Sequence, residues 1–220
     1  MKEVSIITAN HLKTKRNYIE RMVNDKVNCM NVAKKYSKEY WDGDRKFGYG
    51  GYKYINGYLT PVAKKIIKIF KLSNNSKIVD IGCGKGFLLY EIKKILPKIK
   101  ITGLDISKYA KQNAKKEIRS KIKIFNVKKK LPFRNKQFDL ALSINCYHNL
   151  KINNLEIALK EISRISKKQF VSVESYRNSL ELFNLQCWAL TCESFFSKDE
   201  WVWIFKKNNY KGLYEFIYFN

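Results

Sequence analysis

The segment Lys77-Ile78-Val79-Asp80-Ile81-Gly82-Cys83-Gly84-Lys85-Gly86 carries the strongest structural signal in this chain of 220 residues. Its first five residues form a short apolar run with β-branched side chains, which predicts a buried strand. The stretch GFLLYEIKKIL at residues 86–96 then has the apolar spacing of a helix. Glycines between a strand and a helix permit a tight turn and let a ligand approach backbone that carries no side chains. We therefore predict a strand–turn–helix unit with a ligand at the turn.

Strands and helices alternate downstream of this unit. The periodicity predicts strands over 100–104, 121–127, 138–144 and 169–174, and helices over 107–119 and 154–165. Parallel neighbouring strands need crossover connections of this kind. The sequence therefore predicts an α/β fold: a doubly wound, mainly parallel sheet with helices on both faces and its ligand at the carboxyl ends of the strands.

Capping signals place two further helices on either side of this region. Thr60-Pro61 predicts a hydroxyl N-cap followed by proline at the first helical position, in a helix that ends near Leu72. Ser197 and Glu200 predict a capping box that opens a helix near the C-terminus.

Composition excludes several classes of protein. The chain is 45% hydrophobic and 14% aromatic, which is neither disordered nor fibrous, and its apolar runs stay below the roughly 18 residues of a membrane span. The N-terminus lacks a long apolar stretch before a cleavage site, so we expect a cytoplasmic protein without membrane attachment. Five cysteines without a CxxC pair and only two histidines, His11 and His148, predict neither disulfides nor a metal site.

The net charge of +25 has two interpretations. Residues 93–136 carry 16 basic and 2 acidic side chains, as a nucleic-acid surface would. However, the chain has 37 Lys against 7 Arg, and Lys, Ile and Asn together make up 81 residues, which is typical of A/T-rich codon usage. Residues 171–220 carry 5 basic and 6 acidic side chains. A nucleic-acid partner is therefore possible but not favoured.

A second acid, Asp105, follows the glycine turn at the end of the next predicted strand. Asp105 closes the strand predicted at 100–104, where a carboxylate can accept both hydroxyls of a ribose. Dinucleotide sites use the spacing GxGxxG, whereas Gly82, Gly84 and Gly86 are spaced GxGxG. In addition, Asp80 stands two residues before the first of these glycines. This spacing disfavours NAD.

The pattern DxGxGxG after a strand, with an acid ending the next strand, resembles motif I and its partner in class I methyltransferases that depend on S-adenosylmethionine (SAM). The resemblance covers about residues 60–175, because Leu131-Pro132-Phe133 and Gln137-Phe138-Asp139-Leu140 also look like the approach to that family's fourth strand. It implies a Rossmann-like fold and SAM as the cofactor. WDGDRKFGYGGYKY and ESYRNSLELFNLQCWALTCESFF further resemble a set of bacterial methyltransferases of unknown substrate. Many class I members end in a two-strand hairpin, but only one strand is clear here, at 213–219, so we expect six or seven strands.

Cofactor contacts follow from this resemblance at the matching positions. Asp80 would orient the methionine end, Asp105 would hold the ribose, and Ile106 would lie against the adenine. Asn126 stands near the position where the family often supplies an acid to the adenine amino group. The full set expected at the cofactor is Asp80, Gly82, Cys83, Gly84, Gly86, Asp105, Ile106, Asn126, Asn145 and Tyr52.

The methyl acceptor is expected beyond the fourth and fifth strands. His148 is suitably placed for a general base near neutral pH, with Tyr147 beside it, although a structural histidine that caps the next helix is the favoured alternative. An insertion at about 176–198 is a natural lid over an acceptor pocket. The residues expected to contact the acceptor are Tyr49, Glu174, Tyr176, Arg177, Trp188 and Glu193. Glu174 and Arg177 could instead pair with each other, and Trp188 could simply pack in the core. Base-methylating enzymes often carry (N/D)PP(Y/F) here, which Asn145-Cys146-Tyr147-His148 lacks.

The chain reads as one compact unit with two parts. Residues 1–58 would form an N-terminal helical cap with an aromatic and glycine loop, and Thr14 predicts an N-cap among the helix-compatible residues 11–37. Residues 59–220 would form the SAM-binding domain. The leading hypothesis is a methyltransferase that modifies an O or N atom of a small molecule, such as a sugar or secondary metabolite. The alternatives are an RNA or ribosome methyltransferase and a SAM-binding protein without catalysis, and the oligomeric state stays open.

Overall fold

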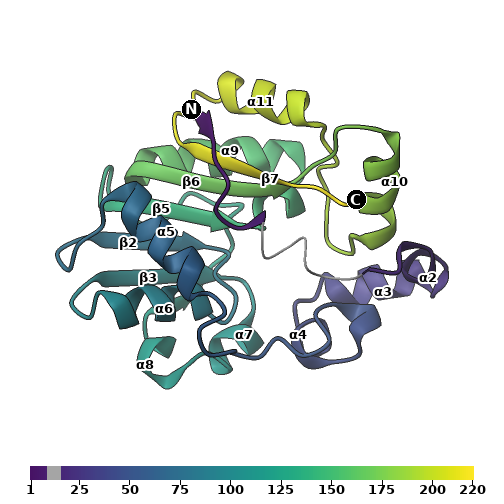
Figure 1. The fold of residues 1–220 in the computed structure, drawn as a ribbon, viewed down its shortest axis with the longest axis horizontal. Coiled ribbons are helices and arrows are strands. Elements are labelled where there is room, and N and C mark those ends of the chain that lie inside the picture. The colour runs from purple at the N-terminus through teal and green to yellow at the C-terminus, as the bar shows by residue number, and fades with distance from the viewer. Residues whose placement is uncertain (9–15) are drawn as a thin grey trace.

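The computed structural model describes residues 1–8 and 16–220. Within them, seven parallel strands form one sheet in the order β1-β7-β6-β5-β2-β3-β4 (Figure 1). Their bounds are β1 Lys2–Glu3, β2 Lys77–Ile81, β3 Lys100–Asp105, β4 Ile122–Ile124, β5 Phe138–Ile144, β6 Ser166–Glu174 and β7 Leu213–Ile217. Every neighbouring pair is parallel. The predicted doubly wound, Rossmann-like α/β fold is confirmed.

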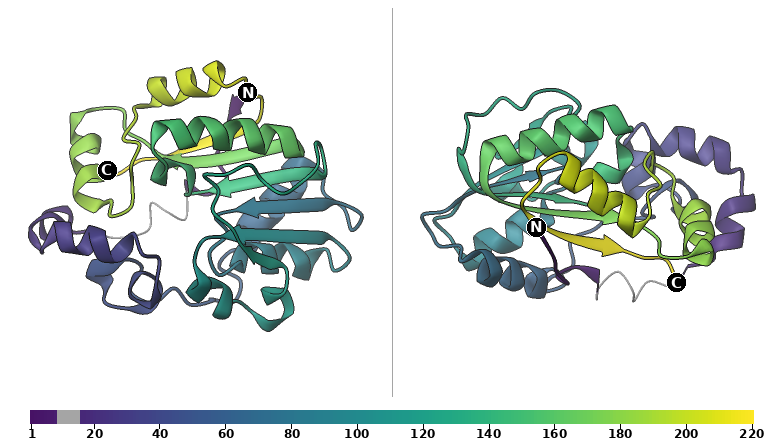
Figure 2. Two further views of the ribbon diagram at one scale, coloured as in Figure 1. Left: turned by 180° about the vertical axis from the view of Figure 1, so that it is seen from behind. Right: turned by 90° about the horizontal axis from the view of Figure 1, so that it is seen from above.

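Helices cover both faces of the sheet. α5 (Thr60–Phe70) and α6 (Phe87–Ile95) pack on one face, and α9 (Ile152–Ile165) and α11 (Lys198–Lys207) lie on the other (Figure 2). Adjacent strand residues alternate between these layers, since Ile78 belongs to the α5 side and Val79 to the α9 side. Both are fully buried, which explains why apolar residues occupy both faces of the strand.

The connections place the ligand-binding crevice at β2. The chain proceeds outward from β2 to β3 and β4, then returns to β5 on the other side of β2. Ligands bind at such a reversal, outside the carboxyl ends of the strands. Short helices lie beyond these ends (Figure 1): α2 Tyr18–Val23, α3 Lys26–Ala33, α4 Lys38–Asp42, η1 Arg45–Phe47 and α10 Ser179–Trp188.

The seventh strand comes from an unexpected part of the chain. β1, at the N-terminus, pairs with β7 and extends the sheet where a C-terminal hairpin was the family expectation. The backbone N–H groups of Ile6, Ile7 and Thr8 then donate to the buried carboxylate of Glu215 at 2.7–2.9 Å. The N-terminal residues are therefore part of the sheet rather than of the helical cap.

Several local predictions need correction. The helix predicted at 107–119 is two short helices, α7 (Lys108–Gln112) and α8 (Lys116–Arg119), because Lys115 takes an extended backbone and Ile118 then packs in the core with Ile122. The strand predicted at 121–127 is only β4.

The capping predictions had mixed outcomes. Leu59, not Thr60, is the N-cap of α5, since the Thr60 hydroxyl donates to Glu91 instead. The capping box of Ser197 and Glu200 is confirmed. Thr14 lies outside the described residues. No helix in the described part of the chain is long and apolar enough to cross a membrane.

Candidate active site

A cavity of about 450 Å³ opens at the carboxyl ends of β2, β3 and β5. The glycine turn after β2 forms one side of it, and Asp105 at the end of β3 lies beside that turn. Most of the expected cofactor set lines this cavity: Asp80, Gly82, Cys83, Gly84, Asp105, Ile106, Asn126, Asn145 and Tyr52. The first cavity therefore gathers residues from three strand ends and from the N-terminal loop.

The glycines of the turn have distinct structural roles. Gly82 and Gly84 adopt φ values of +80° and +56°, which favour glycine. A Cβ on Gly82 would collide with Cys146 Sγ, and one on Gly84 would lie 2.8 Å from the Trp41 ring. Gly86 does not line the cavity, and a Cβ there would press on Ile118 and Ile122. The first two glycines thus let Cys146 and Trp41 approach the turn closely, while the third permits core packing.

Two carboxylates face the first cavity and differ in their hydrogen bonding. Asp105 accepts hydrogen bonds from the backbone N–H groups of Gly84 at 2.7 Å and Ser107 at 2.8 Å. Burial raises its pKa, and these hydrogen bonds oppose that rise. Asp80 is buried and its Oδ1 has no hydrogen-bond partner among the described residues. Burial, and then the neighbouring Asp105, raise the pKa of Asp80 to about 7.

The N-terminal loop covers the turn through aromatic rings. Trp41 stacks on Tyr49 with ring centroids 5.3 Å apart, and Tyr49 contacts Tyr52 at 4.6 Å. Buried Lys85 anchors this loop, since its Nζ lies 2.6 Å from Asp42 Oδ2 and also donates to the Tyr52 carbonyl. The loop and the glycine turn are therefore held together as one unit.

A second cavity of about 380 Å³ adjoins the first. Tyr49, Tyr52 and Asn145 line both cavities. The second is also lined by the predicted acceptor residues His148, Glu174 and Trp188, and by three arginines, Arg16, Arg21 and Arg45. Two adjacent chambers thus meet at the end of β5.

The hydrogen bonds of His148 define its protonation. The backbone N–H of Glu174 donates to Nδ1 at 3.1 Å, so Nδ1 carries no proton and the neutral ring is protonated at Nε2. Nε2 lies 3.5 Å from Glu174 Oε2. Burial lowers the pKa of His148, and Glu174 opposes this effect. His148 therefore presents an N–H to Glu174 rather than a free basic nitrogen.

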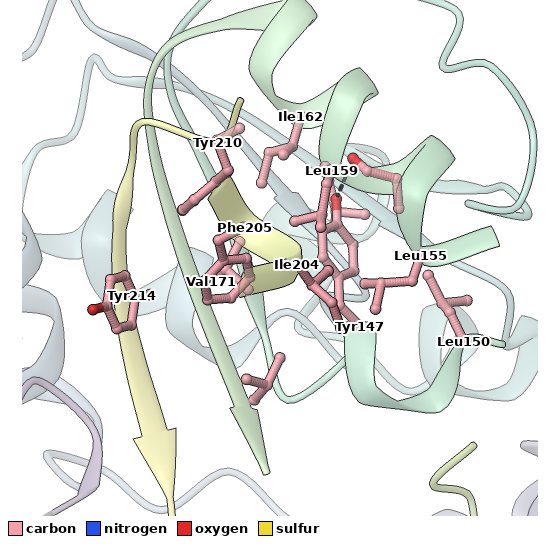
Figure 3. Close-up of a cluster of buried hydrophobic side chains, with 14 of the residues drawn as sticks. Tyr147, Leu150, Leu155, Leu159, Ile162, Val171, Ile204, Phe205, Tyr210 and Tyr214 are labelled. Carbon is pink, nitrogen blue, oxygen red and sulfur yellow. Dashed lines mark hydrogen bonds between the residues drawn. The ribbon is translucent and has the colours of Figure 1, made fainter. Parts of the chain in front are cut away.

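Four other predicted residues lie away from the second cavity. Tyr147 is fully buried in the core beneath α9, where its hydroxyl donates to the Ala158 carbonyl at 3.3 Å (Figure 3). Tyr176 and Arg177 line neither cavity, and Arg177 pairs with Glu181. Glu193 lines the first cavity, where Lys34 pairs with it at 2.8 Å.

Sequence reasoning missed Arg16, Arg21, Lys85 and Trp41 as site residues. Lys85 lies inside the glycine motif, and Trp41 and Arg45 lie inside the stretch WDGDRKFGYGGYKY, so their positions carried a signal. Arg16 and Arg21 lie before and within α2, outside any motif. Only the folded chain brings the three arginines together.

The comparisons with known proteins agree with this geometry. Residues 79–169 match the model of a methyltransferase domain family. The uncharacterized protein MJ1252 of Methanocaldococcus jannaschii is 33% identical over 145 residues, which cover 66% of this chain and 53% of that protein. The ubiquinone biosynthesis O-methyltransferase of Pelagibacter ubique is 29% identical over 150 residues, covering 61% and 58%. The chain thus spans little more than half the length of these relatives.

A solved structure with the same fold is the geranyl diphosphate C-methyltransferase of Streptomyces coelicolor in complex with S-adenosyl-L-homocysteine. Its TM-score is 0.53 at 13% identity, over 66% of this chain and 57% of that one. A parallel sheet with a glycine turn and an acid after the next strand defines a nucleotide-binding α/β domain. The match over residues 79–169 narrows this class: these residues are similar to a methyltransferase domain, and they lie in a parallel sheet with the Rossmann-like strand order.

Proposed function

We propose that this protein is a SAM-dependent methyltransferase that transfers a methyl group to an O or N atom of a small molecule. One observation carries the proposal: the cavity with the glycine turn and two carboxylates adjoins a second cavity that contains a possible proton acceptor. Both cavity volumes fall in the range that is typical of small-molecule binding sites, about 300–1,000 Å³. The name of the Pelagibacter relative also supports an O-methyl transfer.

The residues of the first cavity suit SAM. Asp105 would accept the ribose hydroxyls, Ile106 would pack on the adenine, and Asn126 would accept from its amino group. Asp80 Oδ1, which lacks a partner among the described residues, would face the cationic methionine end. Gly82 and Gly84 line this cavity and present backbone without side chains to the ligand. When bound, SAM supplies an electrophilic methyl group.

The second cavity offers a route for the proton of the acceptor. The carboxylate of Glu174 lines it and would accept the proton from an O–H or N–H group. His148 would position Glu174 through its Nε2–H and through the backbone bond to Nδ1. This proposal differs from the expectation that His148 itself is the base, because Nδ1 already accepts a hydrogen bond and Nε2 faces the Glu174 carboxylate.

We further propose that residues 16–58 and 176–198 cover both cavities together. Lys26 Nζ donates to the carbonyls of Cys187 and Ala189 at 2.6 Å, and Arg21 Nε donates to Trp188 at 3.4 Å. These bonds join the N-terminal helices to α10. Such a cover would exclude water and align the acceptor with the methyl group.

Calorimetric titration tests the cofactor site. Wild-type protein should bind SAM and its demethylated product with micromolar affinity, and Asp105→Ala should lose this binding. Asp139→Asn is the matched control, because Asp139 pairs with Lys167 at the surface. Absence of binding to the wild type, or equal affinities in Asp105→Ala and wild type, would contradict the proposal. With an acceptor in hand, Glu174→Gln should lower kcat while the affinity for SAM stays unchanged.

A further inference from the structure

We propose that the methyl acceptor carries an oxyanion, a carboxylate or a phosphate, which Arg16, Arg21 and Arg45 bind in the second cavity. This inference rests on the proposed function, because it identifies the substrate class of the same site. The acceptor would then have two ends. Its anionic group would lie at the arginines, and its methylated O or N atom would lie near Glu174.

The arginines converge on one side chain. Arg16 precedes α2, Arg21 lies in α2, and Arg45 lies in η1, yet all three surround the ring of Trp188 at the end of α10. Their guanidinium carbons lie 5.4, 4.7 and 4.9 Å from the ring centroid. Guanidinium groups stack favourably on the faces of tryptophan rings. Trp188 thus acts as a platform that holds three cations at one cavity.

This concentration is unusual for the chain. Only 7 of its 44 basic residues are arginines, and three of those 7 line one cavity. The lysines that dominate the net charge are spread along the sequence, whereas these arginines meet only after folding. Codon bias toward lysine therefore does not account for the cluster. Arginine is the side chain that best matches carboxylate and phosphate, because its planar fork can donate two parallel hydrogen bonds.

One acid shares the second cavity with the three arginines. Glu174 is the single carboxylate among the residues that line the second cavity, and His148 already faces it. Neither Arg21 nor Arg45 forms an ion pair with a residue in the described part of the chain. Burial, and then the nearby Arg45, lower the pKa of Arg21 to about 10. A bound anion would relieve this repulsion between like charges.

The guanidinium groups are held in place with donors to spare. Arg21 donates through Nε to Trp188 and through Nη1 to the carbonyl of Arg45. Arg45 donates through Nη1 to the carbonyl of Gly48. Within residues 1–8 and 16–220, no partner takes Nη2 of Arg21, or Nε and Nη2 of Arg45. These N–H groups remain for a ligand, and the backbone bonds reduce the entropy that binding would cost.

Calorimetry with simple anions tests the inference. Inorganic phosphate and succinate are titrated separately into wild type, Arg21→Gln and Arg45→Gln at constant ionic strength set with chloride. We expect at least one anion to bind the wild type, and each substitution to weaken it by about tenfold or more, since it removes hydrogen bonds to a charged ligand. Arg177→Gln is the matched control, because Arg177 pairs with Glu181 outside both cavities and should leave the affinity unchanged.

The outcomes separate this inference from the proposed function. Binding of phosphate alone would assign a phosphorylated acceptor, and binding of succinate alone a carboxylated one. If neither anion binds, or if Arg21→Gln and Arg45→Gln bind as the wild type does, the inference is wrong. Binding of S-adenosylhomocysteine is measured on the same samples. If the wild type does not bind S-adenosylhomocysteine, the proposed function is wrong. If it binds S-adenosylhomocysteine but no anion, only the inference of an anionic acceptor is wrong.

Discussion

At the scale of single residues, Asp80 combines an expected function with a cost in stability. Its pKa of about 7 means that the native protein retains a proton that the unfolded chain, with a pKa near 3.8, has lost. The native state therefore binds more protons than the unfolded state between these values, and stability falls as the pH rises through this window. Above it, a buried carboxylate is ionised without a hydrogen-bond partner for Oδ1 among the described residues.

Asp80→Asn should therefore stabilise the free protein at about pH 8, where the melting temperature should rise by a few degrees. At about pH 5, where Asp80 is already largely protonated, the difference should be much smaller. The same variant should lose affinity for SAM, since the carboxylate would face the cationic end of that ligand. Thermal melts at both pH values, with SAM titrations alongside, check this. A variant no more stable than the wild type at the higher pH would refute the argument.

At the scale of elements, the bond between the N-terminal loop and the glycine turn is the contact to test. The side chain of Lys85 is 4% exposed and that of Asp42 20%, so Asp42→Asn leaves a buried cation with one fewer partner. We expect a loss of about 3 kcal/mol in the free energy of unfolding, measured with urea. Glu156→Gln is the control: it removes a partner of exposed Lys207 and should cost less than about 1 kcal/mol. Equal losses in the two variants would show that burial of Lys85 is unimportant.

Sequence patterns predicted the elements best where both faces are buried. β2, β3 and β5 lie between two helical layers, and their mainly apolar, buried residues gave a clear strand pattern. The failures occurred where a tertiary contact outweighs a local preference. Thr60 is a good N-cap by residue type, but the carboxylate of Glu91 engages its hydroxyl. Helix propensity over 107–119 likewise gives way to the packing of Ile118.

The residues of the candidate site also fall into a group that the sequence predicts and a group that it does not. Asp80, Gly82, Gly84 and Asp105 were predictable, because the spacing of one local motif places them together. The convergence of Arg16, Arg21 and Arg45 was not predictable, because all three contact a tryptophan that lies about 140 or more residues away in the chain. Local sequence periodicity carries no information about contacts between residues so far apart in the chain.

At the scale of the whole molecule, the sheet depends on the first residues of the chain. β1 covers the edge of β7, and the N–H groups of residues 6–8 satisfy the carboxylate of Glu215, which is 1% exposed. Removal of residues 1–8 should lower the melting temperature by about 10 °C, because a buried charge loses its partners.

A paired substitution identifies the cause of that loss. Glu215→Gln should destabilise the full chain, where the carboxylate is satisfied, but should stabilise the truncated chain, where it is not. Melts of the four combinations give the coupling between the N-terminal segment and Glu215. Additive effects would show that the segment acts only by covering the sheet edge.

The pairing of β1 with β7 also has a consequence for biosynthesis. Lys2 lies opposite Leu213, so β1 is synthesised before the other six described strands and can join the sheet only after β7 has been made. Until then, the backbone of β1 is an unpaired strand that a growing chain exposes while its other strands assemble. Contacts this distant in sequence slow folding, because closure of the intervening loop costs entropy before any pairing is gained. The sheet is thus completed only after translation has passed β7, and an interrupted chain has neither its last strand nor its first in place.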